Sequence, residues 1–188
     1  MVTPNQFKKG MKIEIDNEPY AIVDYQHIKM GRGGATVRTK IKSLITGNVI
    51  ERTFKSDEKI DVPNFEEKQM QFLYKEGDAY YFMDTETYEQ IAIDAEILGD
   101  NVLYLIENID VNVQIFNGKV IGINLPNFIE VEVVETEPGL KGDTVSGATK
   151  PAKILPGAII QVPLFINIGD IIKVDTRSGT YIERVKSA

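Results

Sequence analysis

The sequence predicts an all-β protein built from three small modules. Strand-length apolar and aromatic runs alternate with turn residues along the chain, and no pattern of helical period reaches normal helix length. A repeat supports the division, because Val62-Pro-Asn-Phe65 recurs 63 residues later as Leu125-Pro-Asn-Phe128 in a chain of 188 residues. With that spacing, the repeat predicts modules at residues 1–63, 64–127 and 128–188.

The first module is predicted to be a small barrel. We expect strands at residues 12–15, 20–24 and 51–54, with turns at Asp16-Asn-Glu-Pro19 and Gly47-Asn48. Short strands separated by such turns favour a barrel over a helical domain.

The most distinctive stretch of this module, residues 25–43, is predicted to form a hairpin. Its tip, Gly31-Arg32-Gly33-Gly34, places one arginine among three glycines, which permit the positive φ of a tight reversal. After the tip, cations alternate with Val37, Thr39 and Ile41, so that one face of the strand is basic. No acidic residue lies between Tyr25 and Ile50, and the cations there are Lys29, Arg32, Arg38, Lys40 and Lys42.

The hairpin is interpreted as a cationic finger. A solvated charge on an ordinary turn is the simpler explanation of Arg32, but seven strand residues from Tyr25 make a stalk of roughly 23 Å, which suits reaching into RNA. If Met30 pairs with Ala35, His27 faces Arg38 and Tyr25 faces Lys40. One basic face would then carry an aromatic ring and a histidine, an arrangement suited to a phosphate backbone.

Charge is distributed unevenly along the chain, whose net charge is −7. The first 63 residues sum to +3, residues 64–127 to −9 and residues 128–188 to −1. A protein of this kind can place its basic end on RNA while its acidic middle stays off the RNA or faces a basic protein.

The middle module is predicted to alternate strands with one short helical stretch. We expect strands at residues 69–74 and 79–83, one or two helical turns within residues 88–98, and a hairpin turning at Asn117-Gly118. Tyr80, Tyr81 and Phe82 are interpreted as core. We interpret the acidic residues that follow as a solvated face rather than as catalytic pairs; they are Asp84, Glu86, Glu89, Asp94 and Glu96.

The last module is predicted to be a barrel of the oligonucleotide-binding (OB) type. Strands are expected at residues 130–137, 159–162, 171–174 and 181–185, with a loop over residues 138–144. About five short strands in a module of this size are typical of that barrel.

Several classes of function are excluded by composition. The absence of cysteine excludes disulfides, thiolate zinc sites and cysteine nucleophiles. His27 is the only histidine, which excludes histidine-based triads and multi-histidine metal sites. The glycine-rich tip opens no helix and matches no nucleotide-binding loop. We therefore expect no cofactor, no metal and no enzymatic activity. The start is not a signal peptide and no apolar run approaches 20 residues, so we expect a cytoplasmic protein.

Two parts of the sequence resemble bacterial elongation factor P. The finger has the family's glycine-flanked basic tip, followed by the basic strand Ala35–Lys40. The last module carries the more specific match, which consists of Lys150-Pro-Ala152, Gly157, Val162–Ile166, Gly169–Thr176, Gly179-Thr-Tyr181 and Arg184.

The resemblance implies an SH3-like (KOW-type) first domain followed by two OB-fold barrels in an L-shaped, tRNA-like arrangement. It implies a monomer that binds the ribosome between the P and E sites, beside peptidyl-tRNA and ribosomal RNA, and relieves stalling at consecutive prolines. Arg32 becomes the tip residue that reaches toward the peptidyl-transferase centre. The tip loop is Met30, Gly31, Gly33 and Gly34; the backbone contacts are Lys29, Arg38, Lys40 and Lys42; the loop near the E-site codon is Gly142, Asp143 and Thr144.

Two departures from the family pattern affect the tip. Met30 stands where the family often has proline, which leaves the turn less stiff. Arg32 stands where many members carry a lysine that is extended by a lysine derivative; in some arginine-type members this residue is rhamnosylated, which implies a modifying enzyme as a partner. The hypusine-bearing factor of eukaryotes and archaea has a lysine tip and lacks the third module.

Two other classes of function remain as alternatives to an elongation factor. One is a generic single-strand RNA-binding protein, and the other is an enzyme.

Overall fold

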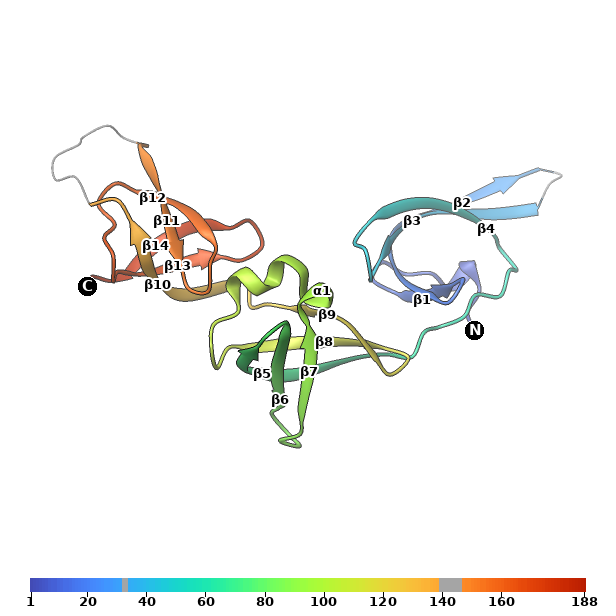
Figure 1. The fold of residues 1–188 in the computed structure, drawn as a ribbon. Coiled ribbons are helices and arrows are strands. Elements are labelled where there is room, and N and C mark those ends of the chain that lie inside the picture. Colours follow the sequence, from blue (N-terminus) through green and yellow to red (C-terminus); the bar gives the residue numbers. More distant parts are fainter. Residues whose placement is uncertain (32–33, 139–146) are drawn as a thin grey trace. The chain divides into compact units, whose positions relative to one another are not determined.

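The computed structural model describes residues 1–31, 34–138 and 147–188, and most of these residues lie in strands of three antiparallel sheets (Figure 1). The predicted all-β class is confirmed. By contacts the chain divides into two compact units, Met1–Glu67 with Gln114–Gly122 and Lys68–Val113 with Ile123–Ala188.

The first sheet has the order β1-β2-β3-β4. Its strands are β1 (Lys12–Ile15), β2 (Glu18–Met30), β3 (Gly34–Ser43) and β4 (Val49–Lys55), preceded by the 3₁₀ turn η1 (Pro4–Gln6). Positive φ angles of 52° and 62° at Asp16 and Asn17 make the tight turn between β1 and β2. The strands bury one face against Phe7, whose ring meets that of Phe54 edge-on at 5.6 Å.

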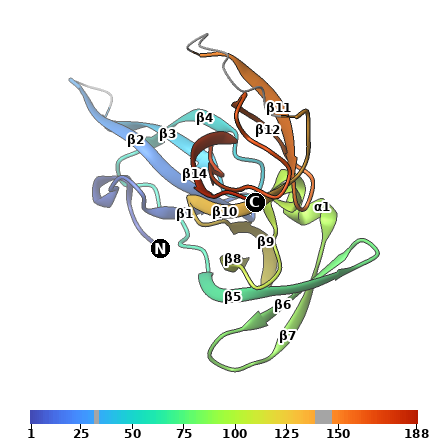
Figure 2. The same cartoon turned by 90° about the vertical axis from the view of Figure 1, so that its left-hand side faces the viewer.

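The second sheet has the order β7-β6-β5-β8-β9, and β5, β6 and β7 are seen as adjacent strands in Figure 2. Its strands are β5 (Phe65–Glu76), β6 (Ala79–Asp84), β7 (Gln90–Asp94), β8 (Asp110–Phe116) and β9 (Lys119–Asn124). Between β7 and β8 lie the helical turns α1 (Ala95–Leu98) and η2 (Gly99–Tyr104). The predicted hairpin is confirmed, since Asn117 and Gly118 have φ angles of 48° and 79°.

The third sheet has the order β12-β11-β10-β13-β14, which repeats the order of the second sheet five strands later. Its strands are β10 (Phe128–Thr136), β11 (Thr149–Ile154), β12 (Ile159–Pro163), β13 (Ile171–Asp175) and β14 (Thr180–Lys186). Val133, Ile160 and Ile172 lie in its core, and Tyr104 and Ile109 of the connecting segments pack against that core.

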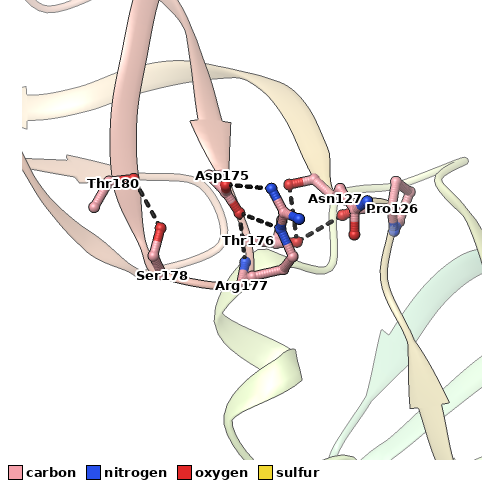
Figure 3. Close-up of polar contacts among 7 residues, drawn as sticks. All are labelled: Pro126, Asn127, Asp175, Thr176, Arg177, Ser178 and Thr180. Carbon is pink, nitrogen blue, oxygen red and sulfur yellow. Dashed lines mark hydrogen bonds and ion pairs between the residues drawn. The ribbon is translucent and has the colours of Figure 1, made fainter.

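The repeated Pro-Asn-Phe segment has the same main-chain contact in both copies. The main-chain N–H of Asn117, in the β8–β9 turn, donates to the carbonyl oxygen of Asn64 at 2.8 Å. The N–H of Thr176, in the β13–β14 turn, donates to the carbonyl oxygen of Asn127 at 2.9 Å (Figure 3). The sequence repeat therefore marks where the chain enters the second and the third sheet. In both sheets, the turn of the last hairpin donates a hydrogen bond to the asparagine of the repeat.

Three details of the middle region and the last sheet differ from the prediction. Strand β7, at residues 90–94, was not expected, whereas the helical turn predicted within residues 88–98 is present as α1. β11 was not expected, since Pro151 lies within it and proline cannot donate to a strand ladder. Tyr80 and Phe82 are buried as predicted, but Tyr81 is only half-buried and stacks on the exposed ring of Tyr74, with centroids 4.6 Å apart.

The acidic face predicted for the middle module is wrong at one position. Asp84 is buried, and its Oδ1 accepts the main-chain N–H groups of Glu86 and Thr87 at 2.8 and 3.1 Å. These bonds lower the pKa of Asp84 and close the turn after β6. The other four acidic residues of the predicted face are exposed: Glu86, Glu89, Asp94 and Glu96.

Candidate nucleic-acid interface

The β2–β3 hairpin positions most of the predicted RNA-binding residues. Its strands pair from Tyr20 opposite Ser43 to Met30 opposite Gly34, and both views show them running side by side toward the tip (Figures 1 and 2). Gly34 has a φ of +78°, a backbone conformation that favours glycine. Arg32 and Gly33, the predicted apex, lie outside the described residues.

The predicted alternation of charge along β3 is present. Val37, Thr39 and Ile41 are buried, whereas Arg38, Lys40 and Lys42 are exposed on the other face. Thr39 is satisfied in the interior because its hydroxyl donates to the carbonyl oxygen of Arg52 at 2.7 Å. The three cations of β3 therefore share the outer face of the sheet.

The predicted register of the hairpin is wrong by one residue. Met30 pairs with Gly34 rather than Ala35, which leaves three residues between the strands instead of four. Since side chains alternate between the faces of a sheet, a slip of one residue moves every side chain of one strand to the other face relative to its partner. As a result, Gln26 lies opposite Arg38, and Asp24 lies opposite Lys40.

The predicted single basic face with an aromatic ring and a histidine is therefore wrong. Tyr25 and His27 lie opposite Thr39 and Val37, on the face away from Arg38, and their rings meet edge-on at 5.7 Å. Lys29, exposed and opposite Ala35, shares that second face. The hairpin presents cations on both sides.

Acidic side chains from neighbouring strands reach the outer face. Glu51 of β4 accepts hydrogen bonds from Nη2 and Nε of Arg38 at 2.5 and 3.2 Å, and its Oε1 lies 4.0 Å from Nζ of Lys40. Asp24 pairs with Lys9 at 2.9 Å. The hydrogen bond from Arg38 lowers the pKa of Glu51, and that from Lys9 lowers the pKa of Asp24.

These acidic partners were missed in the sequence because the acid-free stretch was considered alone. Asp24 directly precedes that stretch and Glu51 follows it closely. In an antiparallel sheet, residues that flank a stretch in sequence return beside it in space, so the acidic flanks signalled that the cations have acidic neighbours. Which cation meets which carboxylate depends on the register, which pairs Lys40 with Glu51.

A shallow polar groove of about 280 Å³ lies on this outer face. Its lining residues are Asp24, Gln26, Arg38, Lys40 and Glu51 of the outer face, together with Tyr25 and Thr39, which pair with each other and belong to the opposite face. The guanidinium and ammonium groups are donors of the kind that bind phosphate oxygens. The groove can therefore bind an anion by hydrogen bonds and charge.

The loop residues Gly142, Asp143 and Thr144 lie outside the described residues. Across the described parts of the chain, no group of three or more His, Cys, Asp or Glu residues is placed to hold a metal ion. The described helices are all too short or too polar to cross a membrane.

Comparison with protein families matches three consecutive segments of the chain. Residues 3–60 match the KOW-like domain of elongation factor P, residues 65–123 its OB domain, and residues 129–184 its C-terminal domain. The predicted SH3-like first domain and the two OB-type sheets agree with these matches.

Similar full-length proteins carry the same name. The elongation factor P of Moorella thermoacetica is 52% identical over 184 residues, covering 98% of this chain and 100% of that protein. That of Natranaerobius thermophilus is 53% identical over 186 residues, covering 99% of each.

Solved structures support the fold. Eukaryotic translation initiation factor 5A from Methanococcus jannaschii has a TM-score of 0.53 and 24% identity, covering 66% of this chain and 92% of that one. A translation initiation factor 5A family protein from Naegleria fowleri has a TM-score of 0.56 and 18% identity, covering 65% and 94%. The family matches, the full-length relatives and the shared fold confirm the resemblance in the sequence: the chain belongs to the elongation factor P family of translation elongation factors.

Proposed function

We propose that this protein binds the ribosome between the P and E sites, beside peptidyl-tRNA, and stimulates peptide-bond formation where consecutive prolines stall synthesis. The observation that carries the proposal is the β2–β3 hairpin, which has exposed cations on both faces and ends at a glycine-flanked arginine in the sequence. Family membership supplies the context of translation elongation.

Arg32 acts at the tip by positioning, not by acid–base chemistry. It reaches toward the acceptor end of peptidyl-tRNA in the peptidyl-transferase centre. Holding that end in a reactive geometry lowers the entropic part of the barrier. Proline benefits most because its ring restricts the backbone and makes it a poor partner in the reaction.

The exposed cations of the hairpin contact the RNA backbone. One face of the hairpin presents Arg38, Lys40 and Lys42, and the other face presents Lys29. The hairpin can therefore contact tRNA and ribosomal RNA at the same time. Gly142, Asp143 and Thr144 lie near the E-site codon. The acidic middle module, which has a net charge of −9, stays off the RNA.

The protein acts as a cytoplasmic monomer of three modules, residues 1–63, 64–127 and 128–188. Arg32 is a candidate site of rhamnosylation by a dedicated modifying enzyme. Met30 in place of proline gives a tip that is less stiff before it binds.

The direct test times the synthesis of a peptide with three consecutive prolines on bacterial ribosomes, with and without protein purified from its own host. Acceleration of this peptide, and none for a control peptide without proline, is the expected result. Equal rates with and without the protein would overturn the proposal. Tight binding to free RNA together with equal rates would identify a generic RNA-binding protein instead.

A further inference from the structure

Charges on the outer face of the first sheet alternate across the strands. Lys9 pairs with Asp24 of β2, Asp24 lies opposite Lys40 of β3, and Lys40 lies opposite Glu51 of β4. Glu51 in turn binds Arg38, one pleat further along β3. The outer face is therefore a ladder of alternating charge and not a row of unpaired cations.

Glu51 interacts with two cations of this ladder, Arg38 and Lys40. One of its carboxylate oxygens accepts both Nη2 and Nε of Arg38, and the other faces Nζ of Lys40. The carboxylate thus uses the same fork of N–H groups that a phosphate would use.

The Glu51 interactions are open to exchange. The side chains of Arg38 and Lys40 are each 57% exposed and that of Glu51 is 47% exposed. Exposed ion pairs contribute little to stability, so an incoming anion can replace the carboxylate without disturbing the fold. A phosphate that enters the groove meets Gln26 as well, directly opposite Arg38.

We propose that this groove binds one phosphate of an RNA backbone and that Glu51 is its displaceable internal competitor. Glu51 holds Arg38 and Lys40 in the geometry that the phosphate needs, and at the same time weakens the contact, since it must be displaced first. Lys42 is different: its cross-strand neighbours, Ala21 and Val49, are apolar and offer no competing carboxylate. The inference rests on the proposed function for the source of the phosphate.

The test compares Glu51→Gln with the wild-type protein on two probes, bacterial ribosomes carrying peptidyl-tRNA and a short RNA duplex. Removing the competitor is expected to tighten binding to both probes by roughly 3- to 10-fold and to steepen the salt dependence by about one to two counterions. Asp57→Asn is the matched control: it removes the same charge from an exposed loop of the same unit and is expected to leave the salt slope unchanged.

A second background separates a local effect from a general change in charge. In an Arg38→Gln, Lys40→Gln protein, Glu51→Gln is expected to gain nothing further, because the two cations that it releases are gone. An equal gain in that background, or equal gains for Glu51→Gln and Asp57→Asn, would overturn the inference. Failure of the wild-type protein to bind ribosomes would count against the proposed function alone, because the duplex still reports on the groove.

Discussion

Thr176 Oγ1 lies 2.6 Å from the carbonyl oxygen of Pro126 and donates a hydrogen bond to it (Figure 3). The main-chain N–H of Thr176 donates to the next carbonyl oxygen, that of Asn127. The same turn contains Gly179, where an added Cβ would lie 2.8 Å from the hydroxyl of Tyr104. The β13–β14 turn therefore holds the chain where it enters β10.

We expect Thr176→Val to destabilise the protein without changing its fold. Valine keeps the shape of threonine but leaves the Pro126 carbonyl without this donor, which costs about 1 kcal/mol in the free energy of unfolding. Urea denaturation measures the change. Ser178→Ala, which removes an exposed hydroxyl that shares a hydrogen bond with Thr180 at the start of β14, serves as the control and is expected to cost less. Equal losses for the two variants would contradict the role given to Thr176.

We expect Asp170 to stabilise the protein above about pH 4 and to lose that contribution in acid. Its side chain is 2% exposed; it accepts the N–H groups of Asn167 and Ala188 and lies 3.5 Å from Nη1 of Arg184. Burial raises the pKa of Asp170, but these hydrogen bonds and Arg184 together outweigh burial and lower it. A carboxylate whose native pKa lies below the unfolded value stabilises the protein above the unfolded pKa, and this is lost as pH falls through the native pKa.

Asp170→Asn tests this expectation by unfolding measurements between about pH 3 and pH 7. The variant is expected to be less stable near neutral pH by about 2 kcal/mol, with the difference shrinking in acid. Glu130→Gln, at an exposed position of the same sheet, is the control and is expected to follow the wild-type profile. A difference for Asp170→Asn that does not vary with pH would contradict the expectation.

Charge reversal on the outer face is expected to weaken ribosome binding. Arg38→Glu and Lys40→Glu each remove a cation and add repulsion toward phosphate, so the affinity should fall and its salt dependence should become shallower by about one counterion for each lost contact. Binding is measured at several salt concentrations. Lys119→Glu, an exposed reversal in the β8–β9 hairpin, is the control. An affinity that does not respond to salt would count against the backbone contacts.

Much of the fold could be predicted because local signals agreed with the final pairing. The alternation around Arg38 identified the buried and exposed faces of β3, and Asn117-Gly118 identified a hairpin. β11 could not be predicted from local signals, since its proline and its buried lysine, Lys150, contradict the usual strand pattern. The Lys150 ammonium is accommodated by a hydrogen bond to the carbonyl oxygen of Glu137.

The candidate site could be predicted in composition but not in detail. The sequence identified Arg38 and Lys40 as neighbours on one face. It could not identify Glu51 as their partner, because that contact depends on the register between β3 and β4. The register of the hairpin itself depends on the geometry of its tip, and a bulge between Ile22 and Asp24 shifts the pairing again.

The role proposed for Arg32 is tested most directly by comparing wild-type protein with Arg32→Ala on ribosomes that must join three consecutive prolines. Binding of both proteins to the ribosome is measured first, so that a lost contact is not mistaken for lost stimulation, and melting curves check that both are folded. We expect rapid synthesis with the wild-type protein and the slow unassisted rate with Arg32→Ala at saturating concentration. Full acceleration by Arg32→Ala, or none by the wild-type protein, would contradict the role proposed for Arg32.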